Sequence, residues 1–225
     1  FGTKTIFEVT GKSYEIEKHF EKFDVQNYIT KTSELVKEIH IKNESDFVIE
    51  NKINYYTRSD ILIFVSGMSM MKKISKELEK LNSEFKYPIV IINLTSAKFK
   101  QAGDDYKNIY KPLQHINIKQ GEKNVKPTRR VIISTKIAET GVTIESLKYC
   151  IDTGFVTSLE YNPNINSQII SNKAVTKSMS IQRKGRVGRV QPGVWYGLYT
   201  NEIFNNLQED SHPNIYVEEF TVPLL

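Results

Sequence analysis

One stretch of ten residues, 180–189, carries a glutamine, Gln182, and three arginines, Arg183, Arg186 and Arg189, with glycines between them. Arginines three residues apart lie on one face of a helix. A guanidinium is always charged, and its planar set of donors fits phosphate oxygens. Two such groups on one face, beside glycines that permit close approach, suit a site at which a polyphosphate bond is transferred.

A solvated basic helix or a general nucleic-acid patch is the simpler interpretation of any two arginines three residues apart. The whole string Gln-Arg-x-Gly-Arg-x-Gly-Arg favours the phosphate site instead, because it is the pattern of the arginine fingers of motor NTPases.

A second candidate stretch runs from Val131 to Ile144. Its apolar start predicts a buried strand that ends at Ser134 and Thr135, followed by a turn containing Gly141. Hydroxyls and free backbone N–H groups at the carboxyl end of a strand are placed to meet phosphate or sugar oxygens. An ordinary strand exit with capping hydroxyls is the alternative.

Gly11-Lys12-Ser13 imitates the end of a phosphate-binding P-loop, but the glycine that the pattern requires five positions earlier is Ile6. The chain also lacks an Asp-Glu-x-His strand end that would hold magnesium. The arginines therefore come without a nucleotide pocket of their own, and we expect the nucleotide to lie at an interface with another domain.

Short apolar runs separated by helical patterns describe the elements that must position these residues. Continuous apolar runs of this length are typical of strands covered on both faces, as in a parallel sheet. The expected strands are 61–65, 89–92, 131–133, 149–151 and 194–199. The expected helices are 23–41, a segment with Met71, Ile74, Leu78 and Leu81 on one face, and 104–110. The alternation predicts an α/β fold, doubly wound around a mainly parallel sheet.

Two segments depart from the alternation. Residues 121–128 read as a polar loop, and two short runs around Asn162-Pro-Asn-Ile-Asn166 predict a β-hairpin that projects from the sheet, over about 156–171. A surface hairpin without a task is the alternative for the second segment.

The composition fits a soluble globular domain: 225 residues, 39% hydrophobic, 25% charged, with a net charge of +5. That charge admits a polyanionic partner without requiring one. A single cysteine, Cys150, excludes an intrachain disulfide and favours a reducing compartment. We find no signal peptide and no apolar run long enough for a bilayer, and we therefore expect no membrane role. Both ends suggest a piece of a longer protein.

The two candidate stretches together resemble motifs V and VI of superfamily 2 helicases, of the DEAH-box or DExH group. The similarity extends along nearly the whole chain in the family's order, and it is nearer to the viral branch typified by the poxvirus nucleoside triphosphatase helicase. The further matching segments are 1–5, 61–67, 109–112, 151–155, 161–163, 192–193 and 198–200. The resemblance implies a second RecA-like domain over 1–205 and an exit segment, 206–225, toward a winged-helix domain.

Roles at the nucleotide follow from the same resemblance. Arg186 and Arg189 match the fingers that reach the γ-phosphate, and Gln182 matches the residue that orders the attacking water. Gly141 and Thr143 match positions that line the nucleotide. Three further residues complete the implied nucleotide site, namely Glu145 near the ribose, Tyr110 stacked on the base and Arg183. An interface or core aromatic is the alternative for Tyr110.

The resemblance also implies partners. Ser66, Gly67 and Thr135 match positions that touch the backbone of the tracked strand, and Lys136, in place of a common asparagine, would meet a phosphate. The implied partners are single-stranded or duplex RNA and a P-loop RecA-like domain of the same polypeptide. The implied cofactor is ATP or another NTP with Mg²⁺, held mainly by that P-loop domain. The compartment would be the cytoplasm, a viral factory or the virion for a viral member, and the nucleus for a cellular one.

The expected function is therefore NTP hydrolysis coupled to 3′-to-5′ translocation and unwinding of RNA. A DNA translocase of the same superfamily and a degenerate RecA-like module that binds RNA without catalysis stay open as alternatives. A non-hydrolytic basic adaptor fits the mild charge least well.

Overall fold

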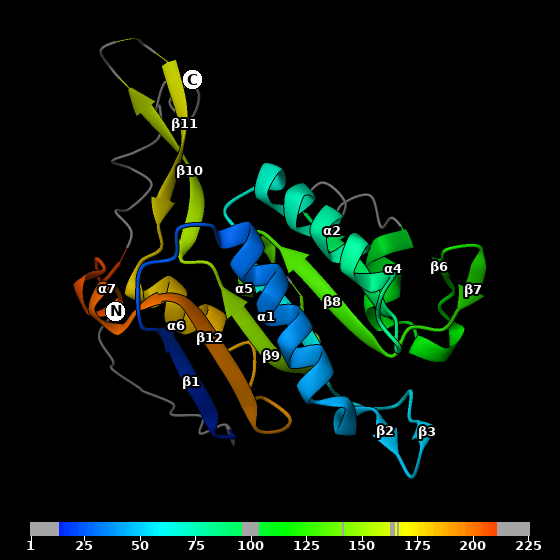
Figure 1. The fold of residues 1–225 in the computed structure, drawn as a ribbon. Coiled ribbons are helices and arrows are strands. Elements are labelled where there is room, and N and C mark those ends of the chain that lie inside the picture. The colour runs from blue at the N-terminus through cyan, green and yellow to red at the C-terminus, as the bar shows by residue number, and fades with distance from the viewer. Residues whose placement is uncertain (1–13, 96–103, 141, 163–164, 166, 211–225) are drawn as a thin grey trace, which may run out of the picture.

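A computed structural model describes residues 14–95, 104–140, 142–162, 165 and 167–210 (Figure 1). The matching segment at 1–5 and the P-loop imitation at Gly11-Lys12-Ser13 lie outside the described residues, as does most of the expected exit segment. The domain boundaries drawn from the sequence therefore stay predictions.

The centre of the molecule is a six-stranded sheet in the order β1-β12-β9-β4-β8-β5, with every neighbouring pair parallel. The strands are β1 (Ile16–Glu21), β4 (Asp60–Phe64), β5 (Ile89–Leu94), β8 (Arg129–Ser134), β9 (Leu147–Asp152) and β12 (Gly193–Thr200). All five strands expected from apolar runs are present, which confirms the α/β fold with a parallel sheet.

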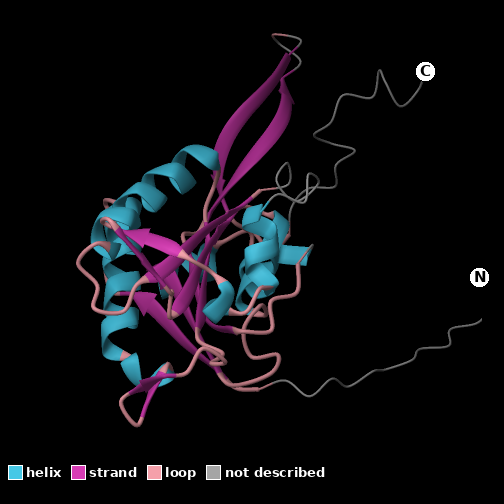
Figure 2. Ribbon diagram, turned by 90° about the vertical axis from the view of Figure 1, so that its right-hand side faces the viewer, coloured by secondary structure: helices cyan, strands magenta, loops and turns pink. Residues whose placement is uncertain are grey.

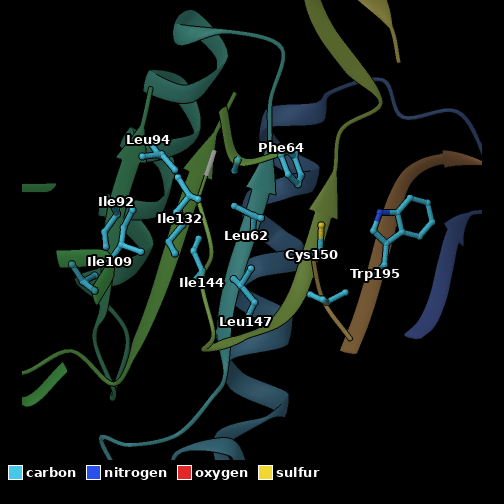
Figure 3. Packing of buried hydrophobic residues seen from close by; sticks show 14 of the residues in the cluster. Leu62, Phe64, Ile92, Leu94, Ile109, Ile132, Ile144, Leu147, Cys150 and Trp195 are labelled. Carbon is cyan, nitrogen blue, oxygen red and sulfur yellow. The ribbon is translucent and has the colours of Figure 1, made fainter. Parts of the chain in front are cut away.

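Helices cover both faces of this sheet. Figure 1 shows α1 (Tyr28–Lys42) and α2 (Met68–Asn82) side by side on one face. The other face carries α4 (Asp104–Tyr110), α5 (Ile137–Thr140) and α6 (Lys177–Lys184), with α7 (Asn201–Asn206) beside β12. Side chains alternate along each strand, so Ile61 and Ile63 pack toward α1 and α2. Leu62 and Phe64 pack on the opposite face (Figure 3).

Two departures from the expected elements have local causes. The first helix begins at Tyr28 and not near Phe23, because Asn27 caps it: its Oδ1 accepts the backbone N–H groups of Ile29 and Thr30 at 3.1 and 3.2 Å. Strand β1 was missed because an edge strand needs no continuous apolar run, and its sequence Ile-Glu-Lys-His-Phe-Glu is largely polar.

Three antiparallel hairpins complete the described part of the fold. The expected hairpin is confirmed and is longer than predicted: β10 (Phe155–Asn162) and β11 (Ser167–Ala174) project beyond the helices (Figure 2). The other two were not predicted. They pair β2 (Val48–Ile49) with β3 (Lys52–Ile53), and β6 (Ile118–Gln120) with β7 (Lys123–Val125), of which only β7 lies inside the expected loop. A 3₁₀ turn, η1 (Glu44–Asp46), lies between α1 and β2, and another, η2 (Leu113–His115), lies between α4 and β6.

A buried histidine makes the stability of this core depend on pH. His40 of α1 is 3% exposed, its Nε2 donates to the carbonyl of Tyr87 at 2.6 Å, and its ring stacks on Phe47. Burial, and then the charge of Arg129, lower its pKa from 6.5 to about 4. The unfolded chain therefore takes up a proton near pH 6.5, whereas the folded chain does so only near pH 4.

Because the folded pKa is depressed, the contribution of His40 is present above pH 6.5 and is lost as the pH falls toward 4. We expect the loss of this contribution to lower the free energy of unfolding by up to about 3 kcal/mol between pH 6.5 and pH 4. Urea denaturation at a series of pH values measures the loss. His40→Gln should flatten the dependence in this window, and an unchanged profile in that variant would contradict the assignment.

Candidate functional site

On the described part of the surface, two open hollows lie at opposite ends of the sheet. The amino-end hollow, of about 730 Å³, is lined by Tyr55, Tyr56, Thr57, Arg58, Ile109, Tyr110, Pro112, Leu113, Arg130, Thr143, Ile144, Glu145 and Ser146. The carboxyl-end hollow, of about 930 Å³, is lined by 26–29, 66–70, Lys73, Thr135, Lys136, 155–157, Ile170 and Asn172.

The amino-end hollow gathers three of the predicted nucleotide residues. Tyr110 closes α4 and is 53% exposed, while Thr143 and Glu145 are exposed on the segment that leads into β9. An exposed aromatic ring offers a flat apolar face, and the threonine hydroxyl and the carboxylate offer hydrogen-bonding groups. The hollow thus has the chemistry to hold a flat heterocycle with a polyhydroxyl group beside it.

Two residues of this hollow were missed in the sequence. Tyr56 is 76% exposed, and its hydroxyl accepts a hydrogen bond from Nε2 of Gln114 at 3.0 Å. Arg58 lies beside it with an exposed side chain. Both precede β4 outside any recognised motif. The cluster Tyr-Tyr-Thr-Arg, two residues before an apolar run, was the available signal.

The arginine segment lies at the same end of the sheet. It spans the carboxyl end of α6 and the turn into β12, where Gly188 has φ +75° and its carbonyl accepts the N–H of Tyr14 at 2.8 Å. A Cβ at this position would lie 2.6 Å from Ile16, so only glycine fits. The turn leaves Arg189 exposed, with its Nε donating to the carbonyl of Gly185 at 3.0 Å, and Gln182 is exposed on α6.

Arg186 connects the arginine segment to the amino-end hollow. It is 5% exposed, and its guanidinium donates to the carbonyls of Glu139, at 3.3 Å, and Val142, next to Thr143. Burial, and then the charge of Arg189, lower its pKa from the usual value. Gln182, Arg186 and Arg189 do not line the hollow themselves; Arg186 holds the backbone at its rim.

Arg183 is placed differently from the expectation. Its side chain is fully buried, with Nε 2.8 Å from Glu139 and Nη1 2.7 Å from Asp152, and its guanidinium lies over the ring of Phe64. Burial opposes its charge, but Asp152 and Glu139 together outweigh this and raise its pKa above the usual value. An arginine held inside by two carboxylates does not face the nucleotide side of the surface, so we remove Arg183 from the nucleotide set.

The predicted Gly141 lies outside the described residues, and its role stays a prediction.

The carboxyl-end hollow gathers all four of the predicted nucleic-acid residues, Ser66, Gly67, Thr135 and Lys136. Lys73 of α2 adds a second cation, and the described residues of the lining include no carboxylate. Gly67 is the N-cap of α2 and gives the first turn no side-chain hydrogen bond, and residues of this turn line the hollow. The hollow therefore suits an anion.

The root of the β10–β11 hairpin forms one wall of this hollow. Thr157 donates to the carbonyl of Ser66 from its N–H at 3.1 Å and from its Oγ1 at 2.7 Å. A Cβ on Gly67 would lie 2.9 Å from the same Oγ1, which explains the glycine. Thr157 was missed because nothing in its local sequence marks it. It fixes the hairpin relative to the strand exit of β4.

Among the described residues, no group of three or more His, Cys, Asp or Glu side chains is placed to hold a metal ion. No described helix is long and apolar enough to cross a bilayer.

Comparison with known proteins identifies relatives of the whole chain. The profile of a family described as "Helicase conserved C-terminal domain" matches residues 43–191. The candidate RNA helicase B962L of African swine fever virus is 36% identical over 224 residues, covering 96% of this chain and 22% of that protein. The ATP-dependent RNA helicase DHX33 of Homo sapiens is 28% identical over 217 residues, covering 96% of this chain and 27% of that protein.

Solved structures share the fold. The DEAH/RHA helicase HrpB of Escherichia coli superposes with a TM-score of 0.72 at 21% identity, over 96% of this chain and 24% of that one. The present chain spans about a quarter of the length of the relatives it matches.

Proposed function

The chain belongs to the helicase C-terminal domain family, and from that premise we propose that it is the second RecA-like domain of an NTP-dependent RNA helicase. The observation that carries the proposal is that residues far apart in the sequence gather in two separate hollows according to their predicted ligand. The nucleotide residues Tyr110, Thr143 and Glu145 share one hollow, and the nucleic-acid residues share the hollow at the opposite end.

At the amino-end hollow, Tyr110 stacks on the base, Thr143 lines the nucleotide and Glu145 lies near the ribose. Stacking on an aromatic ring requires no particular base, so broad nucleotide use follows. Arg186 and Arg189 stabilise the charge that grows on the γ-phosphate oxygens, and Gln182 orders the attacking water. The exposure of Arg189 supports its role, and Arg186 holds the backbone beside Thr143.

The other wall of this site belongs to a P-loop domain of the same polypeptide. That domain also supplies the ligands of the Mg²⁺ that neutralises the phosphates. Hydrolysis opens and closes the cleft between the two domains and moves them along one strand in the 3′-to-5′ direction.

At the carboxyl-end hollow, the first turn of α2 and the two lysines, Lys73 and Lys136, bind backbone phosphates. Ser66 and Thr135 complete the contact. Phosphate contacts position a strand without reading its sequence, as a translocating motor requires. The hairpin beside the hollow either separates the strands of the duplex or wedges behind the tracked strand.

An experiment on the intact protein tests the proposal. We expect it to hydrolyse ATP in the presence of RNA and to displace a strand from an RNA duplex, whereas this 225-residue chain alone hydrolyses no NTP. The measurements are phosphate release and a fluorescent strand-displacement assay on matched RNA and DNA duplexes. Turnover by the isolated chain at a rate typical of an intact helicase would end the shared-site proposal.

The same assay separates the alternatives. Displacement of DNA strands in preference to RNA would favour a DNA translocase. RNA binding without hydrolysis by the intact protein would favour a degenerate binding module. The presence of all three proposed catalytic side chains, Gln182, Arg186 and Arg189, argues against that module.

A further inference from the structure

A buried arginine of β8 joins the two halves of the amino-end hollow. Arg130 is 6% exposed, and its Nε donates to the carbonyl of Asn108 at 3.0 Å. Its Nη2 donates to the carbonyl of Lys111. These two carbonyls flank Tyr110 at the carboxyl end of α4, where a helix leaves carbonyl groups without partners inside the helix. Arg130 therefore holds the backbone on both sides of Tyr110.

The third donor of Arg130 connects it, through Asp60, to the wall of the hollow formed by residues 143–146. Its Nη1 lies 3.0 Å from Oδ2 of Asp60, a carboxylate that is fully buried at the start of β4. The same Oδ2 accepts the hydroxyl of Ser146, and Oδ1 accepts the backbone N–H of Arg130 at 3.0 Å. The backbone N–H of Asp60 donates to the carbonyl of Ser146 at 3.0 Å. Ser146 directly follows Glu145.

We propose that Arg130, together with Asp60, is a positioning residue that sets Tyr110 relative to Thr143 and Glu145 in the nucleotide site. The proposal rests on the proposed function, since it explains what sets the separation between Tyr110 and the pair Thr143 and Glu145 in the nucleotide site. Neither side chain is needed to contact the nucleotide. Together they form one continuous connection from α4 through β8 and β4 to the segment before β9.

Bond geometry makes this pair more than a buried salt bridge. A buried ion pair is often replaceable by apolar residues without loss of stability, so stability alone explains it poorly. The planar guanidinium of Arg130 reaches three acceptors in three directions, and an ammonium group on a lysine stem does not reproduce that fork. The arrangement suits the fixing of two walls at a set separation.

The adjacent residue provides a matched control. Arg129 is also fully buried, forms an ion pair with Asp46 at 2.9 Å, and donates to the carbonyls of Ile39 and Asn43 at 3.2 and 3.3 Å. Side chains alternate across a strand, so these contacts lie at α1 and η1, on the other face of the sheet. Arg129 does not line the hollow.

The test compares Arg130→Lys with Arg129→Lys in the intact protein. For Arg130→Lys we expect the KM for NTP to rise about tenfold with kcat changed by less than about twofold, because binding to a misplaced ring and ribose wall weakens equally in the ground and transition states. For Arg129→Lys we expect KM within about twofold of the parent. Ser146→Ala, a milder change, should raise KM about threefold, because it loosens only the ribose side.

Amide hydrogen exchange gives a readout that does not need activity. In Arg130→Lys, residues 107–113 and 143–146 should exchange faster than in Arg129→Lys at equal global stability. Equal effects of the two lysine variants on KM and on exchange would overturn the proposal and leave Arg130 a structural residue. If the intact parent hydrolyses no NTP, the proposed function fails, whereas the exchange comparison still decides whether Arg130 positions the hollow.

Discussion

Replacing Arg189 by alanine in the intact protein will lower kcat for NTP hydrolysis by roughly a thousandfold, the scale of losing one arginine finger. The side chain is exposed, and its hydrogen bond, from Nε to the carbonyl of Gly185, involves no buried partner. We therefore expect the free energy of unfolding to change by less than about 0.5 kcal/mol. Steady-state phosphate release and urea denaturation measure the two quantities.

Lys184→Ala is the matched control for Arg189→Ala. It removes a cation from the same segment, at the end of α6, and should leave kcat within about twofold because a lysine there faces no predicted phosphate. RNA affinity, measured by fluorescence anisotropy, should be largely unchanged in both variants, because the nucleic-acid residues lie in the other hollow. Equal loss of hydrolysis and RNA binding in Arg189→Ala would instead favour a binding module.

Arg186→Ala is expected to lose hydrolysis as well, but its interpretation is less direct. Arg186 also holds the carbonyls of Glu139 and Val142, so its loss would free the backbone before Thr143. Arg189 is the cleaner test because, among the described residues, its hydrogen bond stays within its own segment.

The fold was predictable because the central strands are buried on both faces. Runs such as 61–65 and 131–133 have no polar interruption, and only a sheet covered by helices on both sides buries them fully. The missed elements lie where burial is partial. Strand β1 is an edge strand, and the β2–β3 and β6–β7 hairpins have too few apolar residues to produce a pattern.

The site was predictable only where a motif marks it. Ser66 and Thr135 were grouped by the resemblance to the helicase motifs, and each follows a strand that ends at the same edge of the sheet. The tertiary fold brings Tyr56, Arg58 and Thr157 to the hollows. No local sequence pattern predicts this placement. Arg183 shows the opposite error. The resemblance placed it in the nucleotide site, but a motif does not reveal which side of its helix packs against carboxylates.

Replacing Arg183 by methionine will lower the free energy of unfolding by about 3 to 5 kcal/mol, the typical result of removing one partner from a buried ion pair. Asp152 is fully buried and Glu139 is 5% exposed, and both would lose the cation that faces them. Asp152 keeps the N–H of Gly154 and the hydroxyl of Tyr199, which neutralise no charge. Urea denaturation of the variant and the parent measures the change.

A triple variant separates this electrostatic cause from lost packing. If uncompensated charge is the main cost, adding Asp152→Asn and Glu139→Gln to Arg183→Met should recover most of the stability, because neutral side chains need no buried cation. If the stability of Arg183→Met falls by less than about 1 kcal/mol while NTP affinity is lost, the arginine acts at the nucleotide after all. Arg183 and Arg189 are six residues apart on one segment. The first is expected to determine stability and the second catalysis, because one faces Asp152 and the other faces solvent.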